Sequence, residues 1–303
     1  DPGLAREALF RVFDMFSERS GEHLRYMDGG AFDTGFVLDQ ALLYPWIARH
    51  YVAGTGDESL LDEGLVRQVA YETDAALFTR LHPEHMLCST ELLPSGDAAD
   101  HAYGTFGNAL LRAFAEALPE LVPKEHPDDA PPRFTGAGPE VAAAIWQHCV
   151  TELDGSPLLA STADLDGASA IYDDPAGSLG LLPFFGFCPE DDPVWTATME
   201  FLRSPRYPLF LSGAVAGVAT RSDPGRACLA ALCTDLLGPG AADALSRLLL
   251  IRFPGGVAAA DYDPATGTAG SAHHAALAGF LAWTLVRAAE PRDSARTTRR
   301  RRR

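Results

Sequence analysis

The sequence is 303 residues long, with 47% hydrophobic residues, 21% charged residues and a formal net charge of −17. This composition is typical of a globular protein and excludes a disordered or low-complexity chain. Seven arginines fall in residues 291–303, which leaves a net charge of −23 on residues 1–290. Such an acidic body argues against a nucleic-acid partner, because phosphate contacts need a basic surface.

Targeting and redox signals point to one compartment. No run of 18 apolar residues predicts a transmembrane helix, so no membrane partner is expected. The first residues carry no signal-peptide pattern. The five cysteines are widely spaced and include no CxxC pair, which predicts free thiols rather than disulfides or structural zinc. We therefore expect a cytoplasmic protein, and the sequence gives no oligomeric state.

Helical periodicity dominates the chain from its start to residue 289. Pro45 lies inside the second apolar stretch and predicts a kink or a break there. The segment Gly54 to Asp57 predicts the end of that helix and a new N-cap at Asp57. The expected helices cover residues 4–18, 36–53, 58–81, 105–121, 138–153, 191–203, 225–237, 239–251 and 270–289.

Four long polar connections separate these helices, over residues 82–104, 154–183, 204–224 and 252–269. Loops of this length are uncommon in a compact domain unless they carry function. Helix pairs joined by elaborate loops predict an all-α fold of the (α/α)6 toroid or barrel type. We expect one helical barrel domain over residues 1–290 and a disordered arginine-rich tail over residues 291–303.

The familiar ligand-binding motifs are missing from the sequence. It contains no GxxxxGK[ST], GxGxxG, GxSxG or HExxH segment, so we expect no cofactor. The segment His82-Pro83-Glu84-His85 places two histidines close together. Its proline and its three-residue spacing on an expected loop do not suit a metal pair, so we predict no metal ligands.

Carboxylates gather in the loops beside aromatic residues and glycines. A glycosidase needs such sets, because one carboxylic acid protonates the leaving oxygen while a second carboxylate activates water or attacks directly. Aspartates are also common in turns and at helix N-caps, which is the alternative role for each of them. The candidates are Asp33, Asp39, Asp97, Asp100, Asp164, Asp166, Asp173, Asp174, Asp261 and Asp263.

Several segments resemble glycoside hydrolase family 125, the metal-independent exo-acting α-mannosidases with an (α/α)6 barrel. Leu93 to Asp97, followed by Tyr103 to Asn108, is similar to the family's "RPSDD…Y…N" segment. Asp164 to Gly167 resembles its "EVDG" segment, and Tyr172 to Gly186 resembles its "DDA.xPSLxxLPYxG" segment. Further similar segments are Leu38-Asp39 to Tyr44-Pro45 ahead of Thr55-Gly56-Asp57, and Arg203 to Pro208. All five occur in the family's order.

The resemblance also shows departures. The family's N-terminal "DIxAMWLRDS" segment has no counterpart, so the barrel is expected to be incomplete at the N-terminus. The family's acid glutamate falls on Asp164, a shorter carboxylate, and its second carboxylate falls on Ala260, with Asp261 beside it. The family's "GSPHTP" segment is matched by residues 219–224 without the histidine.

The resemblance implies a metal-independent inverting glycosidase that releases terminal α-linked mannose, with α-1,6 as the expected linkage, from a glycan or oligosaccharide. Asp164 is cast as the general acid and Asp261 as the base. An inverting mechanism would need these carboxylates roughly 6.5–9.5 Å apart. The expected substrate-binding residues are Asp39, Asp97, Tyr103, Asn108, Asp173, Asp174 and Ser178.

Two other hypotheses stay open. A degenerate relative would bind a glycan without turnover if Asp261 cannot replace the carboxylate lost at Ala260. A lyase or a phosphorylase could use the same toroid. A lyase would need a base such as Tyr103 or His101, and a phosphorylase would need phosphate ligands such as Arg221 and Arg252.

Overall fold

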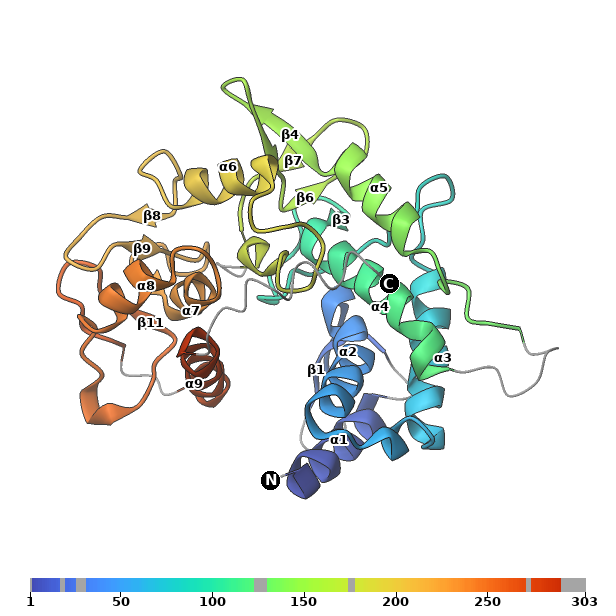
Figure 1. Ribbon diagram of the computed structural model, residues 1–303. Helices are drawn as coiled ribbons and strands as arrows, with labels where there is room; N and C mark the ends of the chain where they lie inside the picture. Colours follow the sequence, from blue (N-terminus) through green and yellow to red (C-terminus); the bar gives the residue numbers. More distant parts are fainter. Residues whose placement is uncertain are drawn as a thin grey trace. The chain divides into compact units, whose positions relative to one another are not determined.

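The structure is a computed structural model, and it describes residues 2–16, 20–25, 31–122, 130–173, 178–270 and 274–289. Helices dominate these residues (Figure 1), which confirms the all-α class predicted from the sequence. The α-helices in this part of the chain are α1 (Pro2–Phe16), α2 (Leu38–Thr55), α3 (Gly64–Phe78), α4 (Thr105–Leu121), α5 (Gly138–His148), α6 (Pro193–Leu202), α7 (Leu229–Leu237), α8 (Ala241–Leu248) and α9 (Ala275–Ala289).

The strands are short and form small antiparallel sheets. Short 3₁₀ turns occur at η1 (Glu58–Leu60), η2 (Leu179–Leu181) and η3 (Pro254–Gly256). The antiparallel pairs are β1 (Glu22–Arg25) with β2 (Ala31–Phe36), β4 (Val150–Leu153) with β5 (Ser156–Leu159), β8 (Phe210–Leu211) with β9 (Gly217–Val218), and β10 (Ala227–Cys228) with β11 (Asp261–Tyr262). A small sheet joins β3 (Tyr103–Gly104), β6 (Thr162–Ala163) and β7 (Ser169–Ala170) in the order β3-β6-β7.

The chain divides into two compact units. The first consists of Asp1–Asp174 and Leu182–Thr198, and the second consists of Pro175–Leu181 and Met199–Arg303. Each unit buries its own set of apolar side chains. The single helical barrel domain predicted over residues 1–290 stays a prediction. The predicted tail, residues 291–303, lies outside the described residues.

In the first unit, α2 packs against α4, and α4 packs against α5 (Figure 1). Pro45 lies inside α2 without ending it. A proline at this position removes the hydrogen bond to the carbonyl of Ala41. The Thr73 hydroxyl on α3 donates to that carbonyl at 3.5 Å, which compensates in part for the lost bond. The helix ends at Gly56 in the left-handed conformation, as the sequence predicted.

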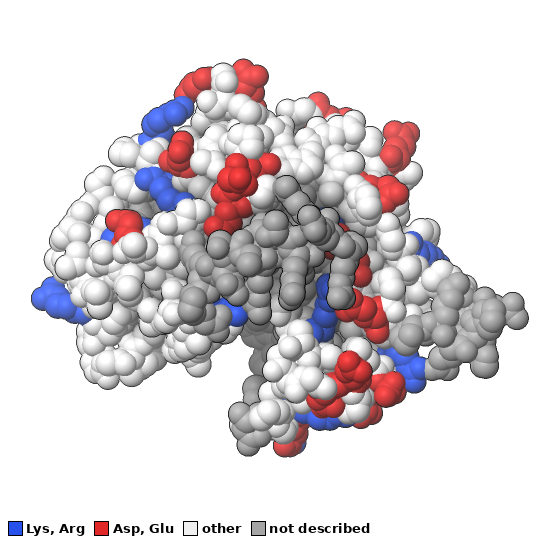
Figure 2. All heavy atoms as spheres, in the orientation of Figure 1, with Lys and Arg blue, Asp and Glu red and all other residues white. Residues whose placement is uncertain are grey.

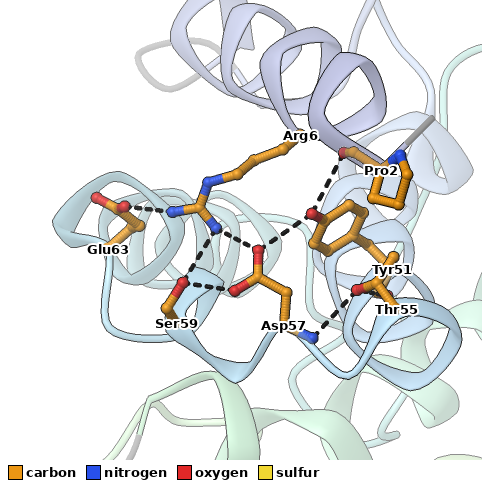
Figure 3. Close-up of polar contacts among 7 residues, drawn as sticks. All are labelled: Pro2, Arg6, Tyr51, Thr55, Asp57, Ser59 and Glu63. Atoms are coloured by element: carbon orange, nitrogen blue, oxygen red, sulfur yellow. Dashed lines mark hydrogen bonds and ion pairs between the residues drawn. The ribbon is translucent and has the colours of Figure 1, made fainter.

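A polar cluster on the first unit anchors α1 (Figure 3). Arg6 donates to Asp57 at 2.7 Å and to Glu63 at 2.6 Å. Ser59 and Tyr51 also donate to the Asp57 carboxylate, at 2.5 Å and 3.1 Å. Asp57 is the predicted N-cap residue, but its side chain makes no capping bond. The hydrogen bonds from Ser59, Tyr51 and Arg6 hold its pKa below the usual value.

Three predicted helices include other elements in the structure. Residues 58–81 contain the turn η1 followed by α3, residues 138–153 contain α5 followed by the strand β4, and residues 225–237 contain the strand β10 followed by α7. Asp154 and Gly155 both have positive φ, of 51° and 77°, and connect β4 to β5. An Asp-Gly pair with this conformation forms a tight hairpin turn, so the hairpin signal in the sequence overrides the helical periodicity before it.

The core of the second unit surrounds α7, which packs against α8 and α9. Asp235 on α7 is 8% exposed and forms ion pairs with Arg203 and Arg247. A buried carboxylate requires such partners, because an unpaired charge in the interior is costly. The pair from Arg247 crosses from α8 to α7 and therefore ties these two helices together.

Candidate active site

The small sheet of the first unit presents one of the predicted catalytic residues. Tyr103 on β3 pairs with Ala163 on β6, and β6 turns into β7 through residues 164–168. The N–H of Thr105, at the start of α4, donates to the Ser161 carbonyl at 2.9 Å. The loop 164–168 therefore projects from a sheet that is fixed to the N-terminus of α4.

Asp164 holds this loop closed. Its Oδ1 accepts hydrogen bonds from the N–H groups of Asp166 and Ala168, each at 2.9 Å. Partial burial acts to raise its pKa, but these two N–H groups and the nearby His101 outweigh that effect, and the pKa lies below its usual value. A general acid needs a raised pKa. Asp164 therefore orders the loop in this structure, and its role as the general acid stays a prediction.

Asp166 lies two residues further along the same loop and is exposed. Between the two aspartates, Leu165 adopts a left-handed backbone with φ of 73°. This conformation costs a residue with a Cβ roughly 1–2 kcal/mol. Strained backbone persists where the surroundings over-determine it, often at functional sites. The two bonds to Asp164 fix this turn, and the turn presents the Asp166 carboxylate to solvent.

Asp39 has a different environment, in the first turn of α2. Asp39 is 7% exposed, and its carboxyl group bonds to no side chain of another described residue. Burial raises its pKa to about 7, although its own backbone N–H acts in the opposite direction. A carboxyl group with a strongly perturbed pKa is a candidate functional group. Acid–base catalysis uses groups that gain and lose a proton near neutral pH.

Three other predicted substrate residues belong to the first unit. Asn108 on α4 is buried, and its amide bonds the N–H and the carbonyl of Cys88 and the carbonyl of Gly104. This fixes the segment around Cys88 onto α4, a structural role. Tyr103 is half-buried, and burial and nearby Cys88 raise its pKa. Asp97 is exposed in the turn that Gly96 makes with a positive φ of 89°. Substrate binding by these residues stays a prediction.

The segment that matches the family's "DDA.xPSL" stretch is described in part. Asp173 and Ser178 are both buried, each 5% exposed. Ser178 directly precedes the turn η2, and its carbonyl accepts from the N–H of Leu181 at 3.0 Å. Asp174 lies outside the described residues. Substrate binding by Asp173, Asp174 and Ser178 stays a prediction.

Asp261 belongs to the second unit, on β11. Its Oδ1 is paired with Nε of Arg226, which also donates to the Thr268 carbonyl at 3.2 Å. A Cβ at position 270 would lie 2.7 Å from Asp261 Oδ1, so only glycine leaves room for the carboxylate there. Ala260 contributes its carbonyl to the Leu229 N–H and has no carboxylate to offer. The predicted base is therefore already engaged by an arginine.

The charges on the described surface are mostly acidic. In Figure 2, acidic side chains are widely spread on the face drawn, and basic ones occur in small separate groups.

No helix in the described part of the chain has the length and hydropathy needed to span a bilayer. The expectation that the chain binds no nucleic acid stays a prediction.

Asp166 was a candidate carboxylate in the sequence, but no role was assigned to it there. The signal was present in the spacing. In an Asp-x-Asp-Gly segment the first carboxylate readily bonds the N–H two residues further on, as in an Asx turn. That bond engages the first aspartate and leaves the second one to project from the turn.

The fold matches those of solved carbohydrate-active enzymes. A metal-independent α-mannosidase from Streptococcus pneumoniae, in a non-productive complex with α-1,6-mannobiose, is 16% identical with a TM-score of 0.75. The match covers 95% of this chain and 79% of that one. A bacterial glucoamylase complexed with acarbose is 14% identical with a TM-score of 0.69, over 93% of this chain and 45% of that one.

A third structure is more distant. An endo-β-1,4-glucanase from Acetobacter xylinum is 12% identical with a TM-score of 0.52, covering 93% of this chain and 89% of that one. Such identities show the fold alone. They confirm the predicted (α/α)6-type fold.

Comparison with the sequences of curated proteins finds no match. The sequence model of the metal-independent α-mannosidase family GH125 matches residues 72–223, which is half of the chain and includes the loop 164–168. The resemblance seen in the sequence is therefore confirmed: the chain belongs to the metal-independent α-mannosidases of family GH125 and is a glycoside hydrolase.

Proposed function

We propose that this protein hydrolyses terminal α-linked mannose from a glycan or oligosaccharide, with α-1,6 as the preferred linkage and with inversion of the anomeric configuration. The observation that carries the proposal is the family match over residues 72–223. The similar fold of an enzyme solved with α-1,6-mannobiose supports the choice of linkage to be tested first.

Asp166 is the carboxyl group that protonates the leaving oxygen in this proposal. Asp164 orders the loop through its two backbone hydrogen bonds, and Asp166 projects from that loop into solvent. The exposed carboxyl group of Asp166 is open to the glycosidic oxygen of a bound sugar, and a general acid must lie within hydrogen-bond reach of that oxygen. Asp164 as the acid is the alternative that this assignment replaces.

A second candidate function is glycan binding without turnover. Two observations favour it: Ala260 has no carboxylate, and Asp261 is occupied by Arg226. A base that activates water must have a free lone pair directed at that water. If Asp261 serves as the base, Asp261→Asn removes turnover and keeps binding. If the parent protein binds mannobiose without releasing mannose, the binding function is the correct one.

The decisive experiment compares Asp166→Asn with Asp164→Asn in the hydrolysis of α-1,6-mannobiose and an aryl α-mannoside. The amide oxygen of asparagine can accept both backbone bonds that Asp164 accepts, so the loop survives in Asp164→Asn. We expect Asp166→Asn to lose on the order of 10²–10⁴-fold in rate and Asp164→Asn to lose less than about tenfold.

The reverse order would return the acid role to Asp164. Product anomers read by NMR immediately after turnover report inversion or retention. Retained activity in the presence of a chelator would agree with a metal-independent reaction. Equal rates on α-1,2-, α-1,3- and α-1,6-mannobiose would contradict the proposed linkage preference.

A further inference from the structure

A pocket on the first unit lies outside the loop that carries Asp164 and Asp166. It has a volume of about 430 Å³ and is lined by residues 81–86 and by one face of α5. Three histidines meet there: the His82 and His85 rings stack at 4.7 Å, and the His85 and His148 rings lie 4.2 Å apart. The volume falls within the range of small-molecule sites, roughly 300–1,000 Å³.

One side of the pocket is pre-organised. His82 Nδ1 accepts hydrogen bonds from the N–H groups of Glu84 and His85, at 3.1 Å and 3.2 Å. An Nδ1 that accepts places the ring proton on Nε2, so neutral His82 offers a donor there. The edge-on contact with Tyr103, at 5.7 Å, also supports the ring. His82 is therefore held in one orientation before any ligand arrives.

His148 lacks a partner that its position calls for. Its Nε2 is buried and has no hydrogen-bond partner among the described residues. A buried nitrogen of this kind costs free energy unless a ligand or water satisfies it. His148 lines the pocket, but its Nε2 atom is closed off from solvent, so a ligand can supply the missing bond only if the ring turns toward the pocket.

The lining excludes two classes of ligand. It contains no lysine or arginine and includes the carboxylates of Glu84 and Glu140, which disfavours phosphate and other anions. A metal ion needs ligand lone pairs that converge on one point. Face-stacked imidazoles direct their lone pairs along parallel planes, and no metal-holding group of three ligands occurs among the described residues.

We propose that this pocket is a second carbohydrate site, which binds a neutral hexose unit apart from the loop 164–168. Hydroxyl groups donate and accept, so they match the His82 Nε2 donor and the two glutamate carboxylates at once. The apolar face of a hexose fits the imidazole rings and the side chains of Ala143 and Met86. The proposal rests on the proposed function only for the choice of mannose as the sugar.

The test uses histidine-labelled full-length protein and follows the ring resonances by NMR while α-1,6-mannobiose is added. Ala143→Trp fills the pocket from an exposed position of α5, and Ala75→Trp places the same side chain at an exposed position of α3 outside it. His148→Phe assigns the His148 resonance. Gln147→Ala is a milder pocket variant that truncates an exposed side chain.

We expect the His82 and His148 rings to shift with sugar in the parent protein and in Ala75→Trp. Apparent affinity should fall by at least about tenfold in Ala143→Trp and by a few-fold in Gln147→Ala. The proposal would be overturned if mannobiose still shifts the histidine ring resonances in Ala143→Trp. It would also be overturned if these resonances respond to zinc chloride or inorganic phosphate but not to the sugar.

The same spectra separate this inference from the proposed function. They detect binding without turnover, so a protein that releases no mannose can still show the ring shifts. An active protein whose histidine rings ignore mannobiose would refute the second site alone.

Discussion

Two carboxyl groups of the first unit lie in opposite environments. One is Asp39, at the N-terminus of α2, and the other is Asp164, in the β6–β7 loop. Asp39 is buried without a partner side chain among the described residues, and its pKa rises to about 7. Asp164 is bonded by two backbone N–H groups, and its pKa falls. Both were candidate site residues on the same grounds, so residue type and motif do not predict ionisation. Desolvation and hydrogen-bond donors decide it.

The largest expected effect concerns Asp39 and the pH dependence of stability. Its pKa of about 7 in the fold exceeds that of an unfolded aspartate, near 3.8. The folded state therefore holds a proton that the unfolded state has lost between these values, and the free energy of unfolding falls as pH rises from about 4 to about 7. Asp39→Asn, which cannot ionise, should remove up to roughly 4 kcal/mol of this loss.

Urea unfolding of Asp39→Asn at a series of pH values measures the effect. Asp97→Asn is the matched control, because Asp97 is an exposed aspartate in a turn. If the free energy of unfolding depends on pH in the same way in Asp39→Asn and in the parent protein, Asp39 is ionised in the fold. Asp39 and Asp164 would then not differ in the direction of their pKa shifts.

Asp74 separates burial from hydrogen bonding. It is 5% exposed, as buried as Asp39, yet its carboxylate accepts from the N–H groups of Arg133 and Phe134, each at 3.0 Å. Asp74→Ala leaves both donors without their partner, and hydrogen bonds to a charged group contribute roughly 1.5–3 kcal/mol each. We expect a loss of about 2–4 kcal/mol in the free energy of unfolding.

Chemical denaturation would measure this loss, with Asp62→Ala on the surface as the control. A change below about 0.5 kcal/mol, the usual range for surface substitutions, would mean that the two bonds do not stabilise the fold.

Leu165 tests the conformation of the loop that Asp164 closes. Its φ of 73° suits glycine better than a residue with a Cβ. Leu165→Gly should therefore raise the free energy of unfolding, by about 0.5–1 kcal/mol after the greater flexibility of glycine in the unfolded chain is included. Ala168→Gly, in the same loop, lacks the positive φ and should lower it. Two substitutions with the same sign would contradict a left-handed Leu165.

The smallest effect is expected for Asp164 in acid. A carboxylate with a lowered pKa stabilises the fold above the pKa of the unfolded group, and this contribution disappears as pH falls through its folded value. Because the group is at the surface, the change should be small. Thermal unfolding below pH 4 should show a shallower acid loss in Asp164→Asn than in the parent. If the parent protein and Asp164→Asn lose stability equally below pH 4, Asp164 is not a hydrogen-bonded carboxylate in the fold.

The sequence by itself determined the helical class, most helix positions, the stop at Gly56 and the family, because these depend on apolar periodicity, on local turn chemistry and on short motifs. It also placed Asp164 and Asp166 in one loop. It could not show that Asp164 is hydrogen-bonded while Asp166 is exposed, since the N–H groups that engage Asp164 point at it only after β6 and β7 pair.

Only the tertiary structure decided which groups are buried, bonded or left without a partner. The long-range packing of α2 desolvates Asp39. The Asn108 side chain hydrogen-bonds to backbone groups of Cys88 and Gly104. Asp261 pairs with Arg226, which lies 35 residues away in the sequence. The histidine pocket likewise joins a loop to a helix about 60 residues further on. Such contacts depend on distances in space, which a local pattern of residues does not encode.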